Sequence, residues 1–388
     1  MKEKKTEGRA LFWLLLPLAR LILRKYSFRT DRVPELDGPF LMLANHTTEQ
    51  DFLMAACAAR KPLRFVCGEH LLRGRFGKLL QRFVKPIALP KGASSVPAVK
   101  EILRRLRQGE NVLLFPEGSR SFNGETLPVE PSLGKLVKRS GAALVTYRIT
   151  GGYFVAPRWA YRTRVGPMEG HVVRALRAEE LSGMSVEEIT ALINRDLYEN
   201  AYETQEKAPR PYRGSGLAEG LENYLILCPR CGAGDAMVTE GSHFRCTACG
   251  LEGDYDEYGF LRGKDLRFRT VFDWGNWIRE RFDRDMLARN RGDLLFTDRE
   301  IRLFRIDAAE HRTEDCLQAE PLKLYHDRLE IGDFSFPFSE ISQMAMLYFG
   351  KSLLFTCRGE YFGMTGPSFH AWKADRLYRL FRAQANAG

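Results

Sequence analysis

The sequence predicts three structured parts: an α/β domain with a mostly parallel sheet flanked by helices, a small cysteine-rich module, and a small mainly-β, barrel-like domain that ends in a helix. The first rests on short apolar runs that alternate with helical stretches between residues 39 and 202. The second rests on two Cys-x-x-Cys pairs, and the third on a series of short strand-like runs after residue 293. With 388 residues, 44% of them hydrophobic, the chain can fill several cores.

Two apolar runs in the first part, residues 41–44 and 112–115, are predicted to be core strands. A short polar motif follows each of them directly. In open α/β sheets, ligands bind beyond the carboxyl ends of the strands. The sequence therefore predicts one site at that edge, built from both motifs.

Residues 11–26, within an N-terminal segment 1–30, are predicted to form an apolar helix with Lys and Arg at both ends. Pro17 and Arg20 interrupt it, and it is shorter than the roughly 20 apolar residues that span a bilayer. No small-residue cleavage site follows, as a signal peptide would require. We interpret it as a helix lying in the membrane interface, which predicts a peripheral or monotopic protein on the cytoplasmic face. A buried helix is the alternative.

The positive charge lies in the first part of the chain. Residues 1–220 carry 36 Lys and Arg against 23 Asp and Glu, whereas residues 221–388 carry 23 against 26. A basic surface suits anionic lipid headgroups, phosphorylated substrates or nucleic acid, and ordinary solubility charge is the plain alternative.

The first polar motif is H-T-T-E-Q-D, in which His46 and Asp51 are separated by four residues. A reaction in which an alcohol is the nucleophile needs a base that removes the hydroxyl proton. Imidazole suits this role, because its pKa lies near working pH and a carboxylate can fix its tautomer and stabilise its protonated form. A histidine that merely caps the next helix is the structural alternative.

The second polar motif is F-P-E-G-S-R-S, from Phe115 to Ser121. We expect the strand to end at Phe115 and the chain to turn at Glu117 and Gly118. Arg120 then presents a planar guanidinium, which can bind a phosphate through two hydrogen bonds.

The two motifs, in this order and at this separation, resemble the signature of the 1-acylglycerol-3-phosphate acyltransferase family, over about residues 10–205. The resemblance implies that His46 is the general base on the acceptor hydroxyl and that Asp51 orients it, with direct transfer and no covalent acyl-enzyme. It also implies a set of residues that bind the glycerol-phosphate moiety: Lys91, Glu117, Gly118, Ser119 and Arg120.

The sequence departs from the family pattern in three places. Lys91 stands where the family usually has arginine, which keeps the charge but loses the planar fork. Ser119 replaces the common threonine and keeps the hydroxyl. Residues 143–152 lack the prolines of the family's fourth motif. These changes leave a different lysolipid or an amine-bearing lipid open as the acceptor.

The cysteine-rich module contains the pairs Cys228/Cys231 and Cys246/Cys249, with 14 residues between them. This spacing predicts a zinc ribbon in which four thiolates surround one tetrahedral zinc ion. Four sulfur ligands leave no open position, so the zinc should be structural. A redox pair or an iron–sulfur centre is the alternative.

The strand-like runs after residue 293, with a terminal helix at 369–382, predict a domain that resembles a pleckstrin-homology-like barrel. The predicted division of the chain is an interfacial helix at 1–30, an acyltransferase domain at 31–205, a linker at 206–222, a zinc ribbon at 223–255, a helical connector at 256–292 and the β domain at 293–388.

Together with the resemblance, these features predict a membrane-surface enzyme that moves a fatty acyl group from acyl-CoA or acyl carrier protein to the free hydroxyl of a lysophospholipid acceptor, 1-acylglycerol-3-phosphate, which gives phosphatidate. The predicted partners are those substrates, an anionic membrane surface and an unidentified protein bound by the C-terminal domains. Zinc ribbons often bind nucleic acid, but the acidic balance of residues 221–388 argues against it. A catalytically silent scaffold is the remaining alternative.

Overall fold

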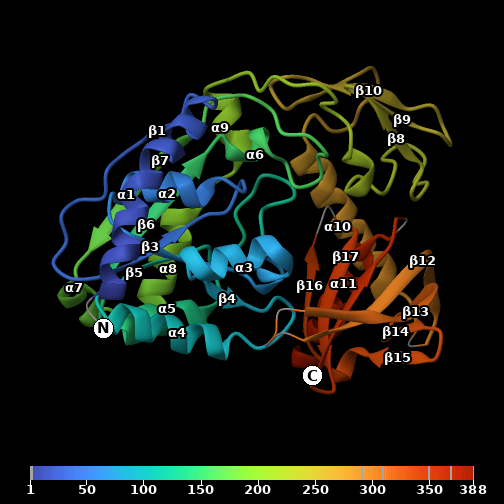
Figure 1. Cartoon of the computed structure of the whole chain (residues 1–388). Coiled ribbons are helices and arrows are strands. Elements are labelled where there is room, and N and C mark those ends of the chain that lie inside the picture. The colour runs from blue at the N-terminus through green and yellow to red at the C-terminus, as the bar shows by residue number, and fades with distance from the viewer. Residues whose placement is uncertain are drawn as a thin grey trace.

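The computed structural model describes residues 3–290, 292–307, 310, 312–347, 350–367 and 369–387. Figure 1 shows the α/β domain on the left, the cysteine-rich module at the upper right and the C-terminal β domain at the lower right, with helix α10 (Val271–Leu287) leading from the second to the third. This order along the chain is the one that the sequence predicts, while the exact domain boundaries stay a prediction.

The described part of the α/β domain has a seven-stranded sheet in the order β1-β7-β6-β2-β5-β3-β4. The pairs formed among β2, β3, β4, β5 and β6 are all parallel, whereas β7 is antiparallel to β6. The prediction of a mostly parallel sheet is therefore confirmed. The strands are β1 (Arg29–Thr30), β2 (Phe40–Ala44), β3 (Leu63–Gly68), β4 (Ile87–Leu89), β5 (Asn111–Leu114), β6 (Ala143–Thr150) and β7 (Glu169–Leu176).

Helices cover both faces of this sheet, so its central strands are buried on both sides. In β2, Phe40 and Met42 belong to a core that also receives residues of α1 and α2, while Leu41 and Leu43 belong to a core shared with α4, α5 and α8. The helices are α1 (Glu3–Arg24), α2 (Asp51–Ala59), α3 (Gly74–Phe83), α4 (Val96–Arg107), α5 (Pro131–Ser140), α6 (Gly152–Val155), α7 (Ala178–Ser182), α8 (Val186–Leu197) and α9 (Ala201–Lys207), with short 3-10 turns at Glu69–Leu72, Leu221–Asn223 and Phe338–Glu340.

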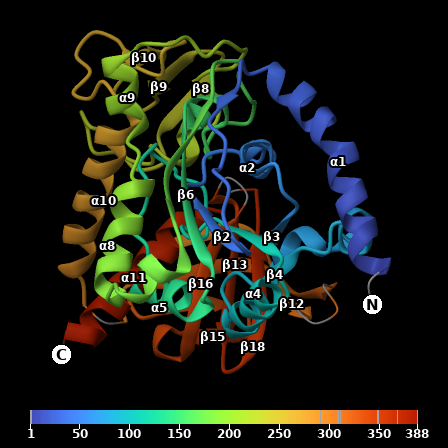
Figure 2. The same ribbon diagram turned by 90° about the vertical axis from the view of Figure 1, so that its left-hand side faces the viewer.

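Helix α1 lies along one side of the molecule, next to α2 (Figure 2). Leu16, Ala19 and Leu23 face the domain and are buried. The opposite side exposes large apolar side chains, with Leu14 74% and Leu21 64% exposed. Among the described residues, no helix is long and apolar enough to cross a membrane. One side of this helix is therefore buried against the domain, while its placement in a membrane interface stays a prediction.

The cysteine-rich module is a four-stranded sheet in the order β11-β10-β9-β8. Its strands are β8 (Met237–Glu240), β9 (His243–Cys246), β10 (Glu252–Tyr255) and β11 (Leu261–Arg262). The module has no separate core, because Phe244, Tyr255 and the α10 residue Trp274 join the same apolar cluster as the α/β domain.

Arg164 shows how closely the two parts are joined. Its side chain is buried, and its guanidinium lies 5.0 Å from the ring centroid of Trp159 in the α/β domain and 4.7 Å from that of Tyr255 in the module. Such cation–π contacts are strongest when water is excluded. Residues 206–222, predicted to be a linker, are themselves packed here, since Leu217 and Ala218 lie in the shared core.

The C-terminal domain is a seven-stranded antiparallel sheet over the described residues, in the order β15-β14-β13-β12-β18-β17-β16, followed by helix α11 (Ala371–Ala387). Its mainly-β character with a terminal helix agrees with the sequence, while the pleckstrin-homology-like identity stays a prediction. The strands are β12 (Leu294–Asp307), β13 (Arg312–Tyr325), β14 (Arg328–Ile331), β15 (Phe334–Pro337), β16 (Ile341–Leu347), β17 (Ser352–Cys357) and β18 (Glu360–Thr365).

Candidate active site

The residues predicted to act together do meet at one edge of the sheet. His46 follows β2, and the turn from Glu117 to Arg120 follows β5, which pairs directly with β2. Lys91 follows β4, whose carboxyl end lies at the same edge because these strands are parallel.

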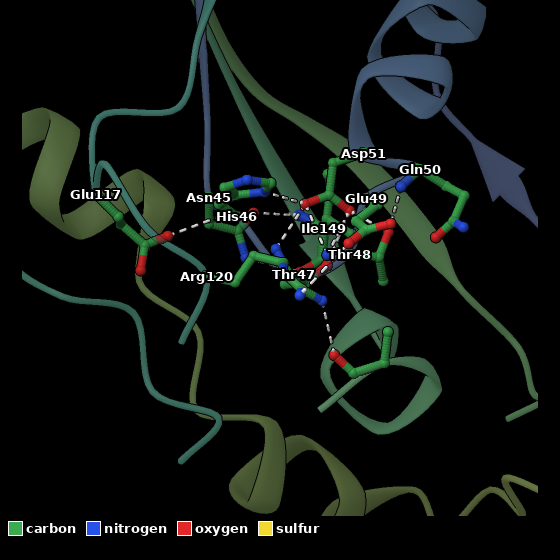
Figure 3. Close-up of polar contacts among 11 residues, drawn as sticks. Asn45, His46, Thr47, Thr48, Glu49, Gln50, Asp51, Glu117, Arg120 and Ile149 are labelled. Carbon is green, nitrogen blue, oxygen red and sulfur yellow. Dashed lines mark hydrogen bonds and ion pairs between the residues drawn. The ribbon is translucent and has the colours of Figure 1, made fainter. Parts of the chain in front are cut away.

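His46 and Asp51 form a hydrogen-bonded pair (Figure 3). The Nδ1 atom of His46 lies 2.9 Å from Oδ2 of Asp51, and Asp51 is fully buried at the start of α2. The carboxylate also accepts hydrogen bonds from the backbone N–H and hydroxyl groups of Thr47 and Thr48. With the carboxylate as acceptor, Nδ1 carries the proton and Nε2 has a free lone pair. The pair is thus arranged as a base and its orienting group.

The surroundings of His46 keep its ring neutral. Burial lowers the pKa of this histidine, the contact with Asp51 raises it, and the positive charges of Lys91 and Arg120 lower it again. The net direction is downward, so the imidazole is unprotonated at neutral pH. Its ring stacks on Phe115, with 4.5 Å between the ring centroids.

The loop that carries His46 is fixed from two sides. Asn45 exchanges two hydrogen bonds with the backbone of Ile149 in β6, at 2.9 and 2.7 Å. The backbone N–H of His46 donates to Oε1 of Glu117 at 2.7 Å, and the N–H of Leu127 donates to Oε2 at 3.1 Å. Burial raises the pKa of Glu117 to about 8. In this structure, Glu117 ties the two motifs together through the backbone.

Three cations gather next to this pair: Lys91, Arg120 and Arg158, which we call the basic cluster. The charges of Arg158 and Arg120 lower the pKa of Lys91, and the charge of Arg120 lowers the pKa of Arg158. Arg120 donates to the Ala156 carbonyl at 3.3 Å and lies 3.7 Å from the exposed Glu49. The basic cluster can hold an anion close to His46.

The turn after β5, residues 117–120, places Ser119 and Arg120 next to Arg158. Gly118 has a φ of +67°, which glycine adopts without strain. Ser119 accepts a hydrogen bond at Oγ from Nη1 of Arg158, at 3.0 Å. A cavity of about 190 Å³ opens beside Arg120, between Glu49 and the segment 156–163. It is large enough for a polar headgroup.

Arg158 is the residue that sequence reasoning missed. It lies beyond β6 in the run A-P-R, residues 156–158, a few positions after the segment in which the prolines of the fourth motif were expected. A proline followed by arginine near a predicted ligand-binding edge is the signal that could have indicated it.

The four predicted cysteine ligands also come together. The Sγ atoms of Cys228, Cys231, Cys246 and Cys249 all lie within 4.8 Å of one another. Two of the sulfur–sulfur distances are 3.7 and 3.8 Å. A tetrahedral zinc site with Zn–S bonds of about 2.3 Å has sulfur–sulfur edges of about 3.8 Å. The group can therefore hold a metal ion, and its dimensions suit zinc.

The match to a family model supports the family resemblance. Residues 25–150 match the family model described as Acyltransferase. Among solved structures, the chain is similar to the 1-acyl-sn-glycerophosphate acyltransferase PlsC from Thermotoga maritima, with a TM-score of 0.45 and 17% identity over 54% of this chain and 84% of that one. No curated protein matches the sequence. Residues 25–150 thus form a domain of the acyltransferase family.

Proposed function

We propose that the protein transfers a fatty acyl group from a thioester, carried by coenzyme A or acyl carrier protein, to the free hydroxyl of 1-acylglycerol-3-phosphate, which gives phosphatidate. The observation that carries this proposal is the His46–Asp51 pair beside the basic cluster. A base next to an anion-binding group suits an acceptor that has both a hydroxyl and a phosphate.

In the proposed reaction, Nε2 of His46 takes the acceptor's hydroxyl proton as the hydroxyl oxygen attacks the thioester carbonyl carbon. Asp51 stabilises the imidazolium that forms. The tetrahedral intermediate then collapses, the C–S bond breaks, and the imidazolium returns its proton to the leaving thiolate. The products are the new ester and a free thiol, and the histidine is ready for another cycle.

The acceptor's phosphate is proposed to bind Lys91 and Arg120, with Gly118 and Ser119 shaping the turn. Hydrogen bonds between charged groups contribute about 1.5–3 kcal/mol each. We therefore expect kcat/KM to be about 10–100-fold lower for monoacylglycerol than for lysophosphatidate of the same chain length.

The measurement is phosphatidate formation from a labelled acyl thioester and lysophosphatidate in vesicles, beside the same assay with monoacylglycerol. Equal use of both acceptors would overturn the phosphate assignment. Product from a lysolipid without a phosphate monoester, and none from lysophosphatidate, would favour the other acceptor class. Absence of product with every acceptor and both donors would favour the scaffold alternative.

We also propose that the exposed side of α1 docks on an anionic membrane surface. Its apolar side chains face away from the domain, and basic residues such as Arg20 and Arg24 lie on the same helix. Burial of one leucine side chain contributes about 1.5–3 kcal/mol. Leu14→Glu and Leu18→Glu are each expected to weaken binding to anionic vesicles by about tenfold or more.

Flotation with vesicles that contain anionic lipid measures this effect. Leu287→Glu is the control, because Leu287 is also an exposed helical leucine, 49% exposed, but lies at the end of α10. The proposal fails if all three variants bind the vesicles as the wild type does, or if Leu287→Glu weakens binding equally.

The metal at the four cysteines is proposed to be zinc. Cys228 and Cys246 are buried and Cys231 is exposed, so the site lies near the surface of the module. When bound, the zinc would hold the two Cys-x-x-Cys loops together, and four thiolate ligands would leave no position for a substrate.

A further inference from the structure

The C-terminal β domain contacts two of the three residues of the basic cluster. The Nη2 atom of Arg158 donates to the carbonyl of Met346 in β16 at 2.7 Å. The hydroxyl of Tyr361 in β18 donates to the carbonyl of Lys91 at 2.6 Å. The hydroxyl of Thr356 in β17 donates to the carbonyl of Gly92 at 2.7 Å. The appended domain therefore holds both segments that carry these cations.

The approach of the two domains is close at Gly92. This residue has a φ of +74°, and a Cβ atom there would lie 2.4 Å from the carbonyl oxygen of Leu354 in β17. Only glycine fits this position without displacement of backbone. The loop that carries Lys91 is thus seated directly against the β domain.

Arg158 is a buried cation. It is 8% exposed, and its guanidinium lies 4.2 Å from the ring centroid of Phe122. Its hydrogen-bond acceptors among the described residues are the Ser119 hydroxyl and the carbonyls of Arg120 and Met346, with no carboxylate in hydrogen-bond or ion-pair contact. A buried charge without a paired opposite charge is costly.

The positive charges of the basic cluster repel one another. Burial lowers the pKa of Arg158 to about 9, and the charge of Arg120 lowers it as well. Burial likewise lowers the pKa of Lys91 to about 8, together with the charges of Arg158 and Arg120. A phosphate placed among these groups would relieve their mutual repulsion, which makes this side of the site specific for an anion.

We infer that the C-terminal β domain is part of the acceptor-phosphate site, and that Arg158 is the positioning residue through which it acts. Arg158 donates hydrogen bonds to the hydroxyl oxygen of Ser119 and the carbonyl of Arg120 on one side, and to the carbonyl of Met346 on the other. The remaining N–H groups of Arg120, beyond the one that donates to Ala156, and the hydroxyl proton of Ser119 are thereby left to the phosphate. This inference rests on the proposed function.

The test compares substitutions across the domain contact with matched substitutions inside the β domain. Tyr361→Phe and Thr356→Val each remove one hydroxyl that reaches the Lys91 loop. Tyr378→Phe is the control for the first, because the Tyr378 hydroxyl donates to the carbonyl of Ile341 within the β domain. Thr365→Val is the control for the second, because the Thr365 hydroxyl donates to the carbonyl of Lys351. Arg158→Gln and Arg158→Lys complete the set.

We expect Arg158→Gln to raise the KM for lysophosphatidate by about tenfold, with kcat and the KM for the thioester within about twofold of wild type. Arg158→Lys should recover part of the loss, since it keeps the charge. Tyr361→Phe and Thr356→Val should each raise the acceptor KM by about threefold, and their controls should not. Calorimetric binding of sn-glycerol 3-phosphate is the second readout and should weaken in the same order.

An unchanged acceptor KM and unchanged glycerol 3-phosphate binding in Arg158→Gln would overturn the inference, as would cross-domain variants that behave like their controls. If Arg158→Gln does not fold, the tyrosine and threonine pairs still decide the question. If the wild type makes no phosphatidate but binds glycerol 3-phosphate, and the variants weaken that binding, the site stands and the proposed reaction fails. If the wild type does neither, both are overturned.

Discussion

His46→Ala is expected to lower the rate of acyl transfer by about 10²–10⁴-fold, the usual contribution of a general base. The substitution removes the only group proposed to accept the acceptor's proton. Because the His46 side chain is one-quarter exposed, the fold should survive its removal. Phosphatidate formation by purified wild type and variant measures the effect, and the unfolding temperature checks the fold.

The chain offers a matched control for this experiment. Nδ1 of His171 lies 3.4 Å from a carboxylate oxygen of Asp31, which gives a second histidine–aspartate pair, but on an exposed surface. His171→Ala should leave the activity unchanged. Equal activity of His46→Ala and wild type would remove His46 from its proposed role.

The pH dependence provides a second check on His46. Its pKa is lowered from 6.5 by burial, so the fall of kcat/KM that belongs to His46 should lie in acid, where the imidazole takes up a proton. Glu117 titrates on the other side of neutrality, since burial raises its pKa to about 8. Glu117→Gln should therefore leave the acid limb in place. If the acid limb disappears in this variant, the group whose protonation lowers kcat/KM in acid is Glu117 and not His46.

Removal of the metal is expected to unfold more than the cysteine-rich module. Structural zinc contributes about 10–16 kcal/mol of binding free energy in small peptides, and loss of even about 5 kcal/mol would lower the unfolding temperature of a unit this large by about 5–10 °C. The module shares its core with the α/β domain, and Arg164 lies between aromatic rings of both. Acyl transfer should therefore be lost together with the zinc.

Zinc content, thermal unfolding and activity, before and after treatment with a strong chelator, measure this effect. Cys231→Ser should reproduce it, whereas Cys316→Ser, at an equally exposed cysteine outside the group, should not. Full activity after complete metal removal would show that the module folds without zinc. Separate unfolding transitions of the cysteine-rich module and the α/β domain would contradict their shared core.

The sequence was sufficient for the elements whose pattern is local. The two predicted core strands appear as β2 and β5, because continuous apolar runs bounded by turn residues form buried parallel strands. The cysteine group was predictable because the spacing of its ligands is local within each pair. The helix predicted at 11–26 starts earlier, at Glu3, since helix ends depend on contacts that a periodic pattern does not contain.

Features formed by residues far apart in the chain could not be predicted from local sequence patterns. Two of the short strand-like runs after residue 293, L-L-F-T at 294–297 and I-R-L-F-R-I at 301–306, form one strand, β12, whose pairing with β13 shifts register between them. Proline, glycine and charge content predicted a linker at 206–222, but Leu217 and Ala218 within it are buried in the core shared by the α/β domain and the cysteine-rich module. Arg158 donates a hydrogen bond to the carbonyl of Met346, and no pattern in the sequence near either residue indicates this contact.

The contact between Arg158 and Met346 also has a consequence for synthesis of the protein. The two residues are 188 positions apart in the chain, and His46 precedes both. At translation rates of about 5–20 residues per second, the ribosome needs about 10–40 s to pass from one to the other. During that interval the nascent α/β domain carries His46 and Asp51 but lacks the carbonyl to which Arg158 donates. The proposed acyltransferase would therefore become fully competent only after β16 has left the ribosome.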